Sequence, residues 1–480
     1  MTPGPEAGGP AGWEVVVGLE VHCELATATK LFCGCRNAFG DEPNTNVCPV
    51  CLGLPGSLPV LNRRAVELAV RLGLALGCEV RRSIFHRKNY FYPDMPKDYQ
   101  VSQYDEPLNV GGALELPGGG RVRIARAHLE EDTGKTSHAG ASGRIHGAQA
   151  ALVDYNRAGV PLLEIVSEPD ITSAAQARAY VNELREVIVS VGASDARMEE
   201  GSLRIDANVS VRPAGVPALG TRTEVKNLNS VRSLGRAVEH EAARQAALLT
   251  AGDRVVQETR HWDEDAGRTV ALRSKEEAYD YRYFPEPDLV PLEPEAGWVA
   301  AVEAGLPPLP SARRRALGRT PGPGLAADEA AAVVAAGADG LVVAAVAGGV
   351  EARVAVARAL NEVAGRPGAA GLDPGAFAEV LAMEGAGELT PTQAKSVLAR
   401  LLEGAGSPRE AAAALGYESL GDDAVAAAVE AAAAAHPQEW ARYAAGEDRL
   451  AGFFVGKVMA ATGGRANGRV VTDLLDRRRG

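Results

Sequence analysis

The sequence predicts an α+β protein that begins with a largely antiparallel β-sheet domain and continues as an α-helical region. Strand-like runs with few helical patterns between them fill the first 298 residues. Alanine-rich helical patterns, separated by glycines and prolines, dominate the rest of the chain. Between the two parts, the segment FPEPDLVPLEPEAG at 284–297 contains four prolines. Such a segment breaks regular structure and favours a domain boundary.

The first expected strand, residues 13–25, alternates between an apolar and a charged face. Val17, Leu19 and Val21 share one face, whereas Glu20 and His22 share the other. This pattern is typical of a half-buried strand. A charged face of this kind is commonly only solvated, and that interpretation stays open for this strand.

Two helices are expected in the first domain. Residues 62–80 carry an Ala/Val/Leu stripe, and residues 173–192 form a helix that begins after Ser173 as its N-cap. Further strand-like runs occupy 121–131, 151–159, 162–168, 202–213 and 221–229.

Composition limits the class of protein. At 480 residues the chain is long enough for about three domains. The net charge of −12 argues against nonspecific coating of nucleic acid, although eight Arg or Lys against four acids from Trp440 onward could meet phosphates. Residues 1–12 resemble neither a signal peptide nor an anchor, and we expect a disordered tail there. No run approaches the ~20 apolar residues of a membrane span, so a cytoplasmic protein is expected.

Four cysteines, Cys33, Cys35, Cys48 and Cys51, follow the pattern C-x-C-x12-C-x2-C. Two close pairs of thiolates suit a tetrahedral Zn²⁺ site, and a site with four protein ligands is structural. Reduced thiols without metal remain an alternative, as do disulfides, which a reducing cytosol disfavours. A thioredoxin-like role would need a βαβ setting, which is not apparent.

The chain has two further cysteines, Cys23 and Cys78, outside this pattern. Free cysteine commonly behaves as a small hydrophobic residue. We therefore expect both to be buried apolar side chains, not nucleophiles.

Acidic residues concentrate in or beside several of the strand-like runs. Glu20 and His22 lie two residues apart, and Glu131, Asp206 and Glu224 occupy three other runs. Carboxylates together with an imidazole and water suit Mg²⁺, which commonly bridges to substrate phosphates. Periodicity does not decide which of these acids converge.

Residues 86–107 combine tyrosines with basic side chains. Lys88 and Lys97 are candidates for neutralising phosphate, and Tyr90 for stacking on a base or ribose. A loop that packs its tyrosines on the sheet is the alternative. The GKT at 134–136 does not complete a P-loop, because Leu129 stands where the pattern requires glycine.

Long motifs in consistent order resemble the GatB family, the B subunits of tRNA-dependent amidotransferases. They are GLEVHCEL, KNYFYPDMPKDYQVSQYDEP, HLEEDTGK, DYNRAGVPLLEIVSEPD, MEEGSLRIDANVSVRP, EVKNLNS and DYRYFPEPDLVPL, with LAGFFVGKVMAATGGRANGRVVTDLL near the end. The resemblance covers nearly the whole chain. Glu24 stands where the family frequently has Gln, a mild departure.

The resemblance implies a ligase that forms carbon–nitrogen bonds. Members of the family use ATP and Mg²⁺ to phosphorylate the side-chain carboxylate of Glu-tRNA(Gln) or Asp-tRNA(Asn), and ammonia then displaces phosphate. The implied partners are an amidase subunit, which supplies ammonia from glutamine, a small third subunit, and tRNA(Gln) or tRNA(Asn). Two rival hypotheses are a free-standing ATP-dependent carboxylate ligase and a noncatalytic, zinc-bearing tRNA-binding scaffold.

The resemblance also implies a domain plan and a set of site residues. A catalytic cradle domain with the zinc site is expected at 13–298, a helical domain at 299–408 and a small helical tail domain that binds tRNA at 409–480. Magnesium falls on Glu20, His22 and Glu131. The wider catalytic set adds Asp206, Glu224 and Lys88, and the nucleotide contacts are Lys88, Tyr90 and Lys97.

Overall fold

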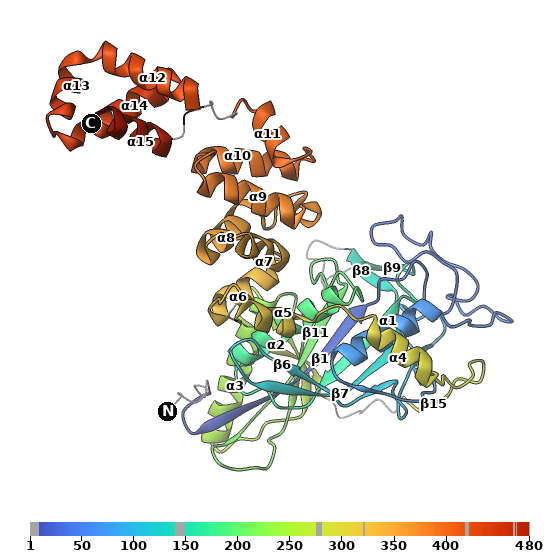
Figure 1. Ribbon diagram of the computed structural model, residues 1–480. Coiled ribbons are helices and arrows are strands. Elements are labelled where there is room, and N and C mark those ends of the chain that lie inside the picture. The colour runs from blue at the N-terminus through green and yellow to red at the C-terminus, as the bar shows by residue number, and fades with distance from the viewer. Residues whose placement is uncertain are drawn as a thin grey trace. The chain divides into compact units, whose positions relative to one another are not determined.

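The computed structural model describes residues 9–139, 149–274, 281–319, 322–417, 422–463, 466 and 468–479. The chain divides into two compact units, the first ending at Pro310 and the second beginning at Ser311. Figure 1 shows the sheet within the first unit and the helices of the second. Each unit is described by itself.

The first unit is built on one large sheet. Its described strands are β1 (Trp13–Glu24), β2 (Glu79–Val80), β3 (His86–Asn89), β4 (Tyr99–Ser102), β5 (Asn109–Val110), β6 (Ala113–Glu115), β7 (Arg121–Glu131), β10 (Pro161–Ser167), β11 (Leu203–Pro213), β12 (Thr223–Lys226), β13 (Glu258–Asp263), β14 (Arg268–Ser274) and β15 (Phe284–Pro285). The main path runs β14-β13-β12-β11-β1-β10-β7-β4-β3-β15. Among these described pairs only β12 and β13 are parallel. A separate hairpin pairs β8 (Lys135–Ala139) with β9 (Ala150–Asp154).

The centre of the sheet has one apolar and one polar face. On β1, Val17, Leu19 and Val21 are fully buried in the main core, which also contains side chains of three helices. These helices are α1 (Arg63–Ala75), α2 (Ala174–Ser190) and α3 (Val231–Thr250). Because side chains alternate along a strand, Glu20 and His22 lie on the opposite face.

Local signals explain where the helices begin and end. The Ser173 hydroxyl accepts the backbone N–H of Gln176 at the start of α2, as the predicted N-cap requires. The helix predicted at 62–80 begins after Asn62 but ends at Ala75. Gly77 then adopts a left-handed φ of 69°, which stops the helix and lets the chain enter β2.

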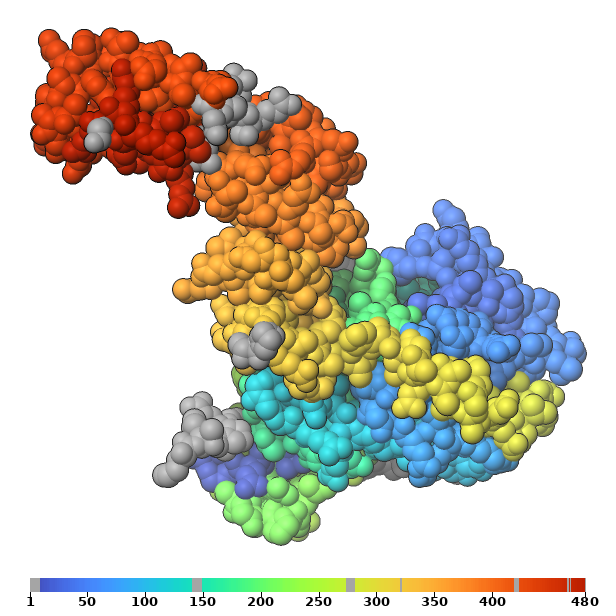
Figure 2. Space-filling model, viewed as in Figure 1, coloured from blue at the N-terminus to red at the C-terminus, as the bar shows by residue number. Residues whose placement is uncertain are grey.

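A fourth helix packs on α1. Helix α4 (Ala296–Ala304) contributes Val302 to the core of the first unit. Figure 2 shows the yellow segment that carries α4 lying against the blue surface of the segment that carries α1. The first unit thus continues past the proline-rich stretch at 284–297.

The described residues of the second unit form helices joined by turns and loops, without a strand. From α5 onward the helices are α5 (Pro310–Leu317), α6 (Ala327–Ala335), α7 (Asp339–Ala347), α8 (Ala352–Arg358), α9 (Pro374–Gly385), α10 (Pro391–Leu402), α11 (Pro408–Ala414), α12 (Asp422–Ala435), α13 (Pro437–Ala444), α14 (Ala451–Ala461) and α15 (Gly468–Arg479), with short turns η1 (Ala359–Val363), η2 (Ala369–Gly371) and η3 (Asp448–Leu450). Phe377 and Val397 lie in one hydrophobic core and Phe454 and Leu475 in a second. The predicted α+β class is therefore confirmed, while the three domain boundaries stay a prediction.

No single helix of the described residues meets the length and apolarity needed to cross a membrane. Helices α6 and α7 meet them only together, and a bend of 119° separates the two.

Candidate active site

The polar face of the sheet brings side chains from five neighbouring strands into rows. Glu20 on β1 lies opposite Asp206 on β11, and Asn208 lies opposite Glu224 on β12. In the other direction His22 lies opposite Glu164 on β10, which in turn lies opposite His128 on β7. The antiparallel register therefore makes neighbours of groups that are up to about 200 residues apart in sequence.

The first acidic cluster consists of Glu20, Asp206 and Glu224. One carboxylate oxygen from each lies within 4.8 Å of the other two. The Lys226 Nζ lies 2.9 Å from Asp206 Oδ2 and 3.1 Å from Glu224 Oε1, and the Asn208 amide donates to Glu20 Oε1 at 2.9 Å. Carboxylate and amide oxygens are hard-cation ligands, so this cluster can hold Mg²⁺.

Electrostatics in the first cluster favour a bound cation. Burial, followed by the Glu164 carboxylate, raises the pKa of Glu20. Burial opposes the charge on Lys226, but the Asp206 and Glu224 carboxylates outweigh it and raise the pKa of the ammonium. Lys226 pairs with only two of the three acids, and further positive charge would stabilise the cluster.

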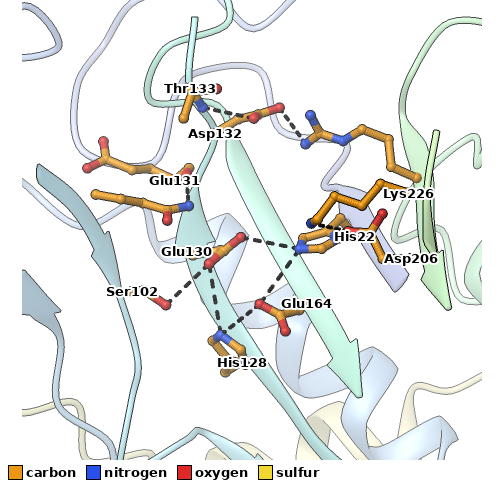
Figure 3. A network of polar contacts seen from close by, with 12 residues as sticks. His22, Ser102, His128, Glu130, Glu131, Asp132, Thr133, Glu164, Asp206 and Lys226 are labelled. Atoms are coloured by element: carbon orange, nitrogen blue, oxygen red, sulfur yellow. Dashed lines mark hydrogen bonds and ion pairs between the residues drawn. The ribbon is translucent and has the colours of Figure 1, made fainter. Parts of the chain in front are cut away.

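The second cluster consists of His22, Glu130 and Glu164, with His128 beside it (Figure 3). The His22 Nε2 lies 3.8 Å from Glu130 Oε1 and 3.7 Å from Glu164 Oε2. The His128 Nε2 lies 3.4 Å from Glu164 Oε2. An imidazole and two carboxylates are again a plausible ligand set for a divalent cation.

Burial shifts the pKa values of the second cluster in opposite directions. Burial, followed by the nearby Glu164, raises the pKa of Glu130 to about 6. Burial lowers the pKa of His128 to about 4, so this imidazole is neutral near pH 7. Burial also opposes ionisation of Glu164, but His128 and His22 lower its pKa overall. Such divergent shifts are typical of functional sites.

An arginine side chain, that of Arg204, is held in place beside the end of β7. The Arg204 guanidinium on β11 donates to Asp132 Oδ2 at 2.7 Å, and Arg157 Nε lies 3.4 Å from the same oxygen. The backbone N–H of Thr133 donates to Asp132 Oδ1 at 2.8 Å. Asp132 therefore holds Arg204 in a defined position beside the second cluster.

A cavity of about 630 Å³ opens over this face of the sheet. Its lining includes both clusters in part, together with Arg204, Lys226, Lys88, Tyr90 and Tyr281. The Lys88 Nζ lies 4.8 Å from the centre of the Tyr281 ring, and Tyr90 stacks on Tyr92 with ring centres 5.2 Å apart. A lining that combines cations, aromatic rings and acids can hold a nucleotide and its metal ion.

Two predicted site residues lie elsewhere. Glu131 follows Glu130 on β7 and so points to the other side of the strand, as Figure 3 shows. Its Oε1 lies 2.5 Å from Lys97 Nζ and accepts the Val101 N–H at 2.8 Å. Glu131 and Lys97 border a small cavity of about 70 Å³ beside Cys33 and Cys51, away from Lys88 and Tyr90.

The structure thus brings together Glu20, His22, Asp206, Glu224, Lys88 and Tyr90, and separates Glu131 and Lys97 from them. Sequence reasoning missed Glu130, Glu164, Arg204 and Lys226. The sequence contains a signal for Glu130 in the segment HLE at 128–130. His128 and Glu130 are two residues apart on a strand and therefore share a face. Glu164 required the register of β10, which the sequence does not supply.

The four predicted zinc ligands form a separate cluster. One sulfur atom from each of Cys33, Cys35, Cys48 and Cys51 lies within 4.8 Å of the others. The Cys48 and Cys51 Sγ atoms are 3.9 Å apart, which excludes a disulfide and matches the edge of about 3.8 Å expected for sulfurs 2.3 Å from a tetrahedral zinc. A hydrogen bond with Cys33 is the main cause that lowers the pKa of the Cys51 thiol. The cluster is compatible with structural zinc.

The other two cysteines, Cys23 and Cys78, are buried and belong to the main hydrophobic core. This placement confirms their predicted role as small apolar residues.

Comparison with known proteins covers both units. The GatB/GatE catalytic domain matches residues 15–300, and the GatB domain matches residues 344–478. The B subunit of the aspartyl/glutamyl-tRNA(Asn/Gln) amidotransferase of Frankia casuarinae is 52% identical, with 98% of this chain and 96% of the relative covered. Proteins of the same name from Salinispora arenicola and Thermobifida fusca are 51% and 50% identical, covering 98% and 97% of this chain and 97% and 94% of those relatives. The chain belongs to the GatB family.

Proposed function

We propose that this chain is the B subunit of an aspartyl/glutamyl-tRNA(Asn/Gln) amidotransferase, a ligase that forms carbon–nitrogen bonds with glutamine as amide donor. Relatives of that name, 50–52% identical across nearly the whole chain, support the assignment. The observation that carries the proposed chemistry is the cavity of about 630 Å³, whose lining combines members of two acidic clusters with basic and aromatic side chains.

The reaction we propose has two steps. The γ-phosphoryl group of ATP passes to the side-chain carboxylate of Glu-tRNA(Gln) or Asp-tRNA(Asn), and ADP leaves. Ammonia then attacks the acyl carbon of this mixed anhydride, phosphate leaves, and the amide of Gln-tRNA(Gln) or Asn-tRNA(Asn) remains. A free carboxylate is a poor acyl donor, and phosphorylation supplies the leaving group.

The acidic clusters would hold magnesium, which neutralises charge on the transferring phosphoryl group when bound. Glu20, Asp206 and Glu224 form one candidate ligand set and His22, Glu130 and Glu164 the other. Glu131 remains a predicted ligand that belongs to neither cluster.

The basic and aromatic residues would hold the nucleotide and the substrate. Lys88 and Arg204 present positive charge to phosphate or carboxylate oxygens, and Asp132 fixes the position of Arg204. Tyr90 and Tyr281 offer ring faces to a base.

The other proposed functions lie outside this cavity. Cys33, Cys35, Cys48 and Cys51 would hold a structural zinc. Helix α15 ends with Arg477, Arg478 and Arg479, and we assign the C-terminal helices to tRNA binding. The amidase subunit would supply ammonia, the small third subunit would complete the heterotrimer, and the assembly would act in the cytoplasm.

An amide-formation assay tests the proposal. Mischarged Glu-tRNA(Gln) and Asp-tRNA(Asn) are supplied with ATP and either glutamine or ammonia, with and without the partner subunits. We expect ammonia-dependent product that requires both tRNA and this chain, and glutamine-dependent product only when the amidase subunit is present.

Matched variants complete the assay. Asp206→Asn should abolish product, whereas Asp253→Asn, at an exposed position outside the cavity, should not. ATP turnover that ignores tRNA would favour a free-standing carboxylate ligase. Full activity of Asp206→Asn would favour a noncatalytic scaffold.

A further inference from the structure

The buried lysine Lys30 lies against the thiol cluster. Its side chain is among the largest that are fully buried, with an exposed fraction of 0%. The Lys30 Nζ lies 3.6 Å from Cys51 Sγ and donates to the Tyr155 carbonyl at 3.1 Å. Among the described residues, none of the ion pairs within 4.0 Å joins Lys30 to a carboxylate.

A buried ammonium of this kind needs a compensating negative charge, because transfer of an unpaired charge out of water is strongly unfavourable. Four thiolates (−4) around a divalent zinc (+2) leave about two negative charges in the cluster. The cluster in turn is only partly open to water, so its surplus charge also needs a partner. Lys30 and the cluster each supply the charge that the other lacks.

We propose that Lys30 is a charge-compensating and positioning residue of the thiolate site, and that it ties this site to the active-site end of β7. This inference rests on the zinc site of the proposed function. It assigns to Lys30 no contact with substrate or nucleotide.

A chain of hydrogen bonds connects Lys30 and its neighbour Leu31 to Asp132, directly after β7. Lys30 holds the carbonyl of Tyr155, and the N–H of Leu31 donates to the Gly159 carbonyl at 2.8 Å. The N–H of Gly159 donates to the Asp132 carbonyl at 2.9 Å, and the N–H of Asp132 donates to the Val160 carbonyl at 2.8 Å. Asp132 is the residue that fixes Arg204 in the cavity. Residues 155–160 therefore link the metal cluster to the active site.

The loop between the two thiol pairs holds the same segment from its other end. The Asn44 N–H donates to Asp154 Oδ1 at 2.9 Å, and its side-chain oxygen accepts the N–H of Tyr155 at 2.8 Å. The Asn46 N–H donates to Asn156 Oδ1 at 2.7 Å. Metal binding that orders this loop would thus also order the turn beyond β9.

Zinc retention in the full-length chain gives the first test. The wild type, Lys30→Met and Lys135→Met are compared for zinc per chain and for the rate of zinc loss to a chelator. Lys135 is an exposed lysine of the same unit and controls for the loss of one charge. We expect Lys30→Met to lose zinc about 10- to 100-fold faster, as for other groups that support a metal ligand, and Lys135→Met to match the wild type.

Thermal unfolding gives a second test. It distinguishes charge compensation by Lys30 from a purely structural role. In the zinc-loaded chain, Lys30→Met should lower Tm because the cluster loses its counter-charge. In a Cys48→Ala, Cys51→Ala background, which lacks the sulfur facing Lys30, the same change should raise Tm because it removes an uncompensated buried charge. This reversal of sign requires charge compensation.

The outcomes of these experiments distinguish the proposed zinc site from the proposed role of Lys30. A wild-type chain without zinc overturns the proposed zinc site and this inference with it. A zinc-loaded wild type together with unchanged zinc loss in Lys30→Met overturns the role of Lys30 alone. If Lys30→Met fails to fold with intact cysteines, the Tm of Lys30→Met in the Cys48→Ala, Cys51→Ala background still tests the inference. A fall in Tm in that background contradicts it.

Discussion

Glu130 and Glu131 are consecutive residues of β7, yet their carboxylates lie in two different kinds of site. Glu130 faces His22 and Glu164 at a cavity of about 630 Å³, and its charge is only partly compensated. Glu131 faces the thiol cluster, where Lys97 and a backbone N–H satisfy it. One face of the strand turns an acid toward a cavity, and the other is closed by internal partners.

This comparison shows how a single strand serves two purposes. Alternation sends successive side chains to opposite sides, so the same backbone positions both sites. The thiol side fixes the strand and the turn at 155–160, and the acidic side presents unsatisfied charge.

Substitution of Glu131 should act mainly on stability. Glu131→Gln leaves the Lys97 ammonium, whose side chain is only 9% exposed, without its carboxylate. Breaking a buried pair costs about 3–5 kcal/mol. Urea unfolding of the full-length chain measures the free energy. A Glu131→Gln variant that keeps its stability but loses magnesium affinity would instead support the magnesium role predicted from sequence and break the division.

The buried His128 should make stability depend on pH. Its pKa of about 4 lies below the ordinary value of about 6.5, so the unfolded chain binds more protons between these values. The stability it contributes is therefore present above pH 6.5 and is lost as pH falls through 4, by about 3 kcal/mol in all.

Comparison with His128→Gln isolates this effect. Glu130, whose raised pKa of about 6 opposes it, and Glu164 are present in both proteins. The stability of the wild type relative to the variant should fall between pH 7 and pH 4 in urea unfolding followed by tryptophan fluorescence. A difference that does not change with pH would contradict the burial of a neutral imidazole.

Substitution of Glu130 should act on catalysis. Glu130→Gln removes a proposed cation ligand, and we expect a loss of about 100-fold or more in ammonia-dependent amide formation, because even groups that only support ligands are worth about 10- to 100-fold. Stability should not fall, since the buried carboxylate is itself unfavourable. A Glu130→Gln variant that is less stable but keeps its magnesium affinity would place Glu130 among the structural residues.

The smallest effect is expected for Lys88 in the lining of the cavity. Lys88→Met should raise the KM for ATP about tenfold, the size of one lost charge-assisted hydrogen bond. Lys395→Met, in the second unit, serves as the control for loss of a lysine. A lower kcat at unchanged KM would mean that Lys88 acts on the transferring group and not on nucleotide binding.

Much of this arrangement follows from sequence pattern alone. The strand expected at 121–131 is β7, and Glu20 and His22 lie on one face of β1 as expected. Asp206 and Glu224 were expected within strand-like runs, and they lie on β11 and β12. The alternation of side chains along one strand is enough to predict which residues share a face. It does not predict whether Glu130 or Glu131 lies on the polar face of the sheet, because the sequence does not show which face of β7 meets the helices.

The features that were not predicted depend on pairing across the sheet. Glu164 joins His22 only through the register of β10 with β1, and Lys226 reaches Asp206 only through the pairing of β11 with β12. Lys97 and Tyr90 are close in sequence, yet the turn between β3 and β4 sends them to different cavities. Local periodicity contains no information about such partners.

A crystal of the assembled enzyme with Mn²⁺ and a nonhydrolysable ATP analogue would show where the metal and the nucleotide bind. Anomalous scattering locates the metal without reference to the protein. We predict manganese bound to carboxylate oxygens of Glu20, Asp206 and Glu224, of Glu130 and Glu164, or of both sets, with the nucleotide phosphates toward Lys88. Metal and phosphates bound away from this face, or metal held by Glu131, would contradict the account.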